Sequence, residues 1–111
     1  MPAIPELSPT EFRKRWPVAA NADEVTLLDV REPAELALAA LDGALHIPMR
    51  EIPSRLAELN PRKPLVVMCH SGARSRRVAE FLGANGFEHV FNLKGGIDAW
   101  SEEIDPQVPR Y

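Results

Sequence analysis

The sequence is poor in cysteine, in long apolar runs and in excess charge of either sign. Its 111 residues include one cysteine, Cys69, which excludes an internal disulfide and a multi-cysteine metal site. No stretch approaches the roughly 18 consecutive apolar residues of a membrane-spanning helix. The first residues, MPAIPELSPTEF, lack the basic start and apolar centre of a signal peptide. The formal net charge of -3 argues against a general nucleic-acid-binding surface.

The composition is typical of a globular protein, with 45% hydrophobic and 26% charged residues. The length suits one domain over residues 1–111, which can bury a core without stabilising disulfides or metal ions. We expect a cytoplasmic protein, because a free thiol persists in a reducing compartment. We expect no metal, cofactor, nucleic acid or membrane contact. The sequence shows no exposed apolar stripe that would indicate a dimer, so a monomer is expected.

Apolar runs and helical patterns alternate along the chain. Buried strands are predicted at Val25–Val30, Pro64–Cys69 and His89–Leu93, with shorter ones at 3–7 and 44–47. None alternates cleanly, which is typical of strands covered on both faces. Helices are predicted at 9–16, 33–40, 53–59, 73–84 and 97–103, and an extended tail at 104–111. The alternation predicts a three-layer α/β/α domain with a central, mostly parallel sheet.

Cys69 lies where the most hydrophobic strand ends and a loop of small residues begins. Ligands of parallel sheets bind beyond the carboxyl ends of the strands. Ser71, Gly72 and Ala73 are small enough for their amides to turn inward as an anion cradle. The following helix directs its positive end at the same place, and Arg74 adds a full charge. All of these features favour the thiolate, the reactive form of cysteine.

A lone cysteine is more often a small buried apolar residue than a nucleophile. The placement of Cys69 favours the nucleophile. His70 is adjacent in sequence, but no pattern identifies it as a base, and its ring could simply face solvent. His46 and His89 lie in or beside apolar runs and are expected to be structural.

Four segments, in order, resemble the motifs of the rhodanese (sulfurtransferase) family in its single-domain form. Asp29-Val30-Arg31-Glu32 resembles its D-V-R-E signature, and residues 43–48 (GALHIP) resemble its G-A-x-x-I-P segment. Residues 69–75 (CHSGARS) resemble its active-site loop, C-x-x-G-x-R-S. Gly95-Gly96 with Trp100 matches its G-G-x-x-x-W element. The tail, residues 104–111, resembles the endings of rhodanese domains fused to adenylyltransferases that activate sulfur-carrier proteins.

The resemblance implies a sulfurtransferase that carries sulfur as a persulfide on Cys69. The loop His70, Ser71, Gly72, Ala73, Arg74 and Ser75 would bind the donor, a small molecule such as thiosulfate or a persulfide. The acceptor would be cyanide, a thiol, a thioredoxin-like protein or a sulfur-carrier protein. Asp29 and Arg31 would support the site structurally, Asp29 accepting hydrogen bonds and Arg31 pairing with a carboxylate or carbonyl.

Two alternatives remain at this point. One is a non-catalytic rhodanese-like binding or regulatory module. The other is a phosphatase or arsenate reductase, but related enzymes of that kind have one more residue between cysteine and arginine than the four between Cys69 and Arg74. The shorter loop is associated with a sulfur atom instead of a tetrahedral oxyanion.

Overall fold

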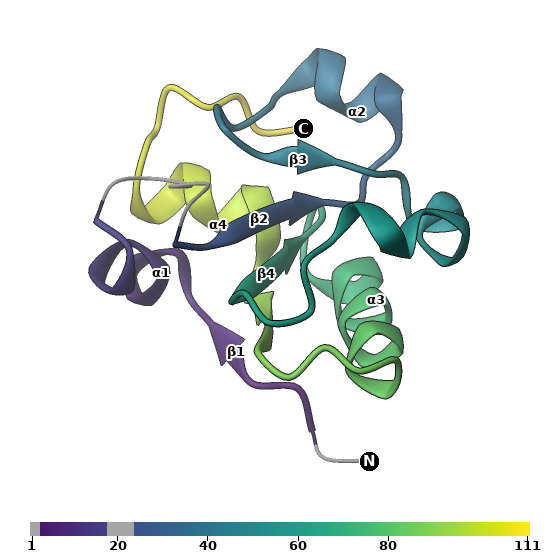
Figure 1. Cartoon of the computed structure of the whole chain (residues 1–111). Coiled ribbons are helices and arrows are strands. Elements are labelled where there is room, and N and C mark those ends of the chain that lie inside the picture. The colour runs from purple at the N-terminus through teal and green to yellow at the C-terminus, as the bar shows by residue number, and fades with distance from the viewer. Residues whose placement is uncertain (1–2, 18–23) are drawn as a thin grey trace.

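A five-stranded parallel sheet forms the centre of the computed structural model, which describes residues 3–17 and 24–111 (Figure 1). The strands are β1 (Glu6–Leu7), β2 (Thr26–Asp29), β3 (Leu45–His46), β4 (Leu65–Met68) and β5 (Val90–Leu93). Their order across the sheet is β1-β5-β4-β2-β3, and each neighbouring pair is parallel. The predicted mostly parallel sheet is therefore confirmed.

Helices cover both faces of this sheet. They are α1 (Pro9–Arg15), α2 (Pro33–Leu38), α3 (Ala73–Ala84) and α4 (Gly96–Glu103), with two 3-10 segments, η1 (Met49–Glu51) and η2 (Pro53–Glu58). Along β4, Leu65 and Val67 join the core cluster under α3, whereas Val66 and Met68 join the cluster under α1 and α4. Both faces of β4 are thus buried, which explains its unbroken apolar run and confirms the three-layer prediction.

The first helix begins as predicted. The Ser8 hydroxyl accepts from the Glu11 amide at 3.1 Å, and the Glu11 carboxylate accepts from the Ser8 amide at 2.8 Å. This capping box satisfies two otherwise unpaired backbone donors. Phe12 then packs between Trp16 and Trp100, with ring centroids 5.4 Å and 5.7 Å away, so both tryptophans belong to the core.

The predicted helix over residues 53–59 is wrong in type. Its backbone bonds, such as Arg55 N to Ile52 O at 3.1 Å and Leu59 N to Leu56 O at 3.0 Å, span three residues, and Arg55 is kinked. The segment therefore forms 3-10 turns, which are common in short pieces.

The helix predicted over 33–40 also ends early, at Leu38. Ala39 is extended, and its carbonyl accepts a 2.8 Å hydrogen bond from Arg31, a side chain contact that replaces the next helical turn.

The sequence predicted an extended tail over residues 104–111, and the structure shows that this is wrong at its start. Asp105 closes a turn in which its carbonyl accepts from the Val108 amide at 3.1 Å and its carboxylate from the Gln107 amide at 3.0 Å. Such side-chain contacts compete with extended backbone. The tail then crosses toward α2, where the chain ends (Figure 1). No helix among the described residues is long and apolar enough to cross a membrane.

Candidate active site

The Cys69 sulfur lies in a ring of hydrogen-bond donors at the carboxyl end of β4. The residue is buried, with 1% of its surface exposed. The Gly72 amide lies 3.1 Å from Sγ and the Ser75 amide 3.4 Å, and the Ser75 hydroxyl lies 3.3 Å away. These groups come from the loop and the first turn of α3. Of the three amides predicted to form the cradle, that of Gly72 bonds the sulfur, whereas the Ser75 donors were not predicted.

These donors shift the ionisation of the thiol. Burial by itself raises the pKa of Cys69. The Ser75 hydroxyl and the amides of Ser75, Gly72 and Ser71 together lower this pKa by more, so the net shift is downward. The pKa of Cys69 is therefore lower than that of an ordinary cysteine, which increases the thiolate fraction at neutral pH.

Asn92, on β5, holds the hydroxyl of Ser75. The Ser75 Oγ lies 2.5 Å from the Asn92 amide oxygen, while the Asn92 amide nitrogen donates to the Gly72 carbonyl at 3.0 Å. A hydroxyl carries one proton, so Ser75 donates either to Asn92 or to Cys69 at any moment. Sequence reasoning missed Asn92, although a polar, strand-disfavoured residue within the apolar run of β5 was a signal that could have found it.

Helix α4 fixes the other side of the loop. The Ile97 amide donates to the Cys69 carbonyl at 2.9 Å, and the Asp98 amide donates to the His70 carbonyl at 3.1 Å. Gly96 has φ +60°, and a Cβ there would lie 2.4 Å from the Cys69 carbonyl oxygen. The glycine pair before Trp100 thus lets α4 approach the loop backbone closely.

Asp29, the last residue of β2, and Arg31, just after it, form a buried ion pair. Arg31 Nη2 lies 2.7 Å from an Asp29 oxygen, and both side chains are almost fully buried. The remaining Arg31 donors reach the carbonyls of Ala39 and Glu35. No hydrogen bond joins either residue to Cys69 within the described chain, a geometry that supports their predicted structural role.

Arg74 points toward α2 instead of lying free beside the sulfur. Its two terminal nitrogens bind the two Glu35 oxygens at 2.6 Å and 2.9 Å, a bidentate pair. These hydrogen bonds are the main reason that the pKa of Glu35 falls to about 2, although partial burial opposes the shift. Glu35 is therefore ionised at neutral pH.

Tyr111 completes this network from the tail. Its hydroxyl donates to Glu35 at 2.8 Å and accepts from Arg31 at 2.8 Å. Its ring stacks on the His70 ring, with centroids 4.2 Å apart and an interplanar angle of 12°. The His70 ring makes no hydrogen bond to Cys69 in the described structure. The sequence did not predict that Glu35 and Tyr111 belong to the site. Their contact joins residues 76 apart in the sequence, which no local pattern reveals.

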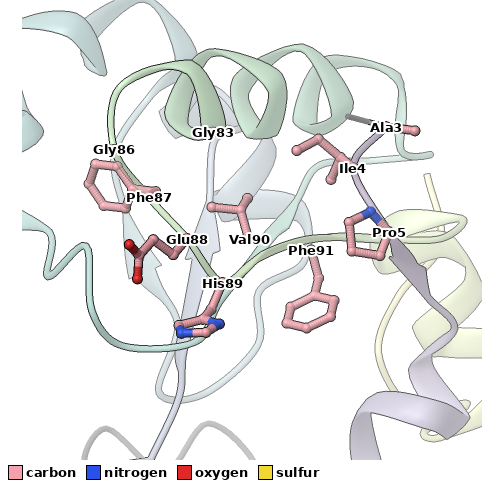
Figure 2. Close-up of a pocket in the computed structure, with 10 residues that line it drawn as sticks. All are labelled: Ala3, Ile4, Pro5, Gly83, Gly86, Phe87, Glu88, His89, Val90 and Phe91. Carbon is pink, nitrogen blue, oxygen red and sulfur yellow. The ribbon is translucent and has the colours of Figure 1, made fainter. Parts of the chain in front are cut away.

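Two hollows include residues 71–74 in their linings, and a third includes no residue of the cysteine loop. Ser71, Gly72 and Ala73 line a polar hollow of about 570 Å³. Arg74 borders another, of about 310 Å³. The third, distant one, of about 510 Å³, lies between residues 3–5 and 83–91, and Figure 2 shows Phe87, His89 and Phe91 along it. Its lining does not include Cys69. His89, expected to be structural, has an exposed side chain there.

No group of three or more His, Cys, Asp or Glu side chains within residues 3–17 and 24–111 is arranged to hold a metal ion.

The fold and the cysteine loop define a rhodanese-type domain. The family model described as "Rhodanese-like domain" matches residues 15–103. The chain therefore belongs to the rhodanese-like domain family. A crystal structure of a rhodanese-like domain protein from Staphylococcus aureus superposes with a TM-score of 0.79 at 30% identity, covering 97% of this chain and 99% of that one.

Curated relatives associate the family match with sulfur transfer. A sulfurtransferase of Allochromatium vinosum is 42% identical over 80% of this chain and 83% of its own. Thiosulfate sulfurtransferase GlpE of Actinobacillus pleuropneumoniae is 34% identical over 96% and 94%. Rhodanese-like/PpiC domain-containing protein 12 of Arabidopsis thaliana is 43% identical over 97% of this chain, which spans 38% of that protein. These relatives support sulfur transfer as the general chemistry of this site.

Proposed function

We propose that this protein transfers a sulfane sulfur through a persulfide on Cys69. The observation that carries the proposal is the cysteine sulfur itself, at a strand end with amide and hydroxyl donors 3.1–3.4 Å away. Those donors favour the attacking thiolate. They also suit the persulfide anion that replaces it, because preorganised donors stabilise charge without rearrangement.

The reaction has two halves. The Cys69 thiolate attacks the outer sulfur of thiosulfate, the bond between the two donor sulfurs breaks, and sulfite leaves. With an organic persulfide as donor, the same attack releases a thiolate. A thiophilic acceptor, which is cyanide in an assay or a thiol, then takes the outer sulfur and regenerates Cys69. The name of the relative GlpE supports thiosulfate as one donor to test.

We place this activity in a reducing cytoplasm, in a monomer. The physiological acceptor proposed is a thiol, a thioredoxin-like protein or a sulfur-carrier protein. The loop residues 70–75 would hold the donor, with Asp29 and Arg31 supporting the rim.

A binding module without catalysis is the second candidate, and the 1% exposure of Cys69 favours it. A phosphatase is a weaker one. The Arg74 guanidinium, which would bind a phosphate, is engaged by Glu35 on both terminal nitrogens.

The test is the intact mass of the purified protein before and after thiosulfate or a persulfide, and again after cyanide. We expect a gain of one sulfur atom that cyanide removes and that Cys69→Ser lacks. Glu88→Gln is the control that should load sulfur like the native protein, since Glu88 is exposed and lies outside the cysteine loop, along the distant hollow. No added sulfur from either donor would overturn the proposal and favour the binding module.

A further inference from the structure

Three arginines around the Cys69 loop pair with carboxylates from other elements. Arg74 of α3 pairs with Glu35 of α2, and Arg76 pairs with Glu6 of β1. Arg50 of η1 pairs with Glu32, the residue before α2. The cations of these three side chains are therefore compensated by neighbouring carboxylates.

This compensation matters for the charge of the donor. Thiosulfate carries two negative charges and must approach a thiolate, so its attack places three negative charges together and releases doubly charged sulfite. Such a step needs unpaired cations at the sulfur. The polar hollow beside Gly72 contains three cations, Arg76, Arg77 and Lys94, against the carboxylates of Glu6 and Glu80, and so offers one net positive charge.

The hollow bordered by Arg74 is suited to an organic group. It measures about 310 Å³ and is lined by the side chains of Val30, Met49 and Pro53, with the charged residues Glu32, Arg50 and Arg74 at its edge. Arg74 of the cysteine loop borders it, and Val30 of its wall belongs to the same core cluster as Cys69. Thiosulfate has no apolar part that could use these walls.

We propose that the sulfur donor is an organic persulfide, R–S–SH, whose R group occupies this hollow, and that Glu35 sets this preference by neutralising Arg74. The proposal rests on the proposed persulfide chemistry of Cys69. The Cys69 thiolate attacks the outer sulfur of neutral R–S–SH, the S–S bond of the donor breaks, and R–S⁻ leaves and takes a proton from water. The products are Cys69–S–SH and the thiol R–SH, with hydroxide balancing the charge.

The first experiment compares kcat/KM for thiosulfate and for N-acetylcysteamine persulfide in the native protein and in Glu35→Gln. Glutamine retains the N3 capping position of α2 but removes the charge. We expect kcat/KM for thiosulfate to rise about fivefold to tenfold as Arg74 becomes unpaired, a change of the size that one charge confers on encounter. We expect kcat/KM for N-acetylcysteamine persulfide to change by less than about twofold, because the persulfide reacts in its neutral form.

Tyr111→Phe is the matched control. It removes the hydroxyl that contacts Glu35 and Arg31 but keeps the Glu35–Arg74 pair. We expect its donor ratio to match that of the native protein. Salt provides a second readout that a merely structural effect would not move, because the thiosulfate rate of Glu35→Gln should fall with added sodium chloride more steeply than that of the native protein.

The hollow is tested with donors of different size. Replacing methyl persulfide by N-acetylcysteamine persulfide should raise kcat/KM in the native protein, and Met49→Gln, of similar length but polar, should reduce this gain while leaving thiosulfate unaffected. Equal rates for both R groups, or an unchanged donor ratio in Glu35→Gln, would overturn the inference. If neither thiosulfate nor a persulfide adds sulfur to Cys69, the proposed function itself fails, which is a different result.

Discussion

At the scale of single residues, the reactivity of Cys69 depends on the Ser75 hydroxyl. This hydroxyl is the largest of the influences that lower the pKa of the thiol. Ser75→Ala should therefore raise the pKa of Cys69 and slow its alkylation by iodoacetamide at pH 7, by up to about tenfold for each unit of pKa. The measurement is the alkylation rate from pH 5 to 10. Ser71→Ala, whose exposed side chain contributes no bond to the sulfur, should leave the profile in place. A Ser75→Ala midpoint equal to that of the native protein would show that the amides alone oppose the effect of burial on the pKa.

At the scale of elements, the contact between α4 and the Cys69 loop depends on Gly96. Gly96→Ala places a Cβ 2.4–2.6 Å from the carbonyls of Cys69 and His70, at a φ of +60°. We expect a loss of about 2–4 kcal/mol in the free energy of unfolding, together with slower alkylation of Cys69. Gly86→Ala is the control: its φ is also positive, but nothing lies within 4 Å of the added Cβ. That variant should lose only about 1 kcal/mol and retain native alkylation. Equal losses in the two variants would mean that backbone strain, and not the close approach, is decisive.

The elements also show how far the sequence predicts the structure. The apolar runs located β2, β4 and β5, and the capping box located α1, because burial and capping are local signals. The 3-10 turns at 53–58 and the turn at Asp105 were missed, since each depends on short-range hydrogen bonds that periodicity does not reveal. In the site, the small residues after Cys69 predicted the loop. The ion pair between Arg74 and Glu35 could not be predicted, because Glu35 lies on another element.

At the scale of the whole molecule, the Glu35 carboxylate ties α2 to α3 and to the tail. Its pKa of about 2 in the folded protein lies below the unfolded value, which is about 4.3. Ionised Glu35 therefore stabilises the fold fully above the unfolded pKa, and this stabilisation disappears as pH falls toward 2. Glu35→Gln should cost about 1 kcal/mol at pH 6.5, a value kept low by solvent screening of the half-exposed Arg74, and less at pH 3.

Urea unfolding of both proteins at pH 6.5 and pH 3 measures this difference. Glu58→Gln, which breaks the exposed pair with Arg55, is the control and should lose less stability at pH 6.5. Between pH 6.5 and pH 3 the unfolded chain becomes protonated at Glu35 while the folded protein, with a pKa of about 2 there, stays mostly ionised, so the contribution of Glu35 to stability must fall. A Glu35→Gln loss that stays constant with pH would contradict the ionic account. The tail would then be held by the stacking of Tyr111 on His70, and the charge at the rim would be set by other groups than Glu35.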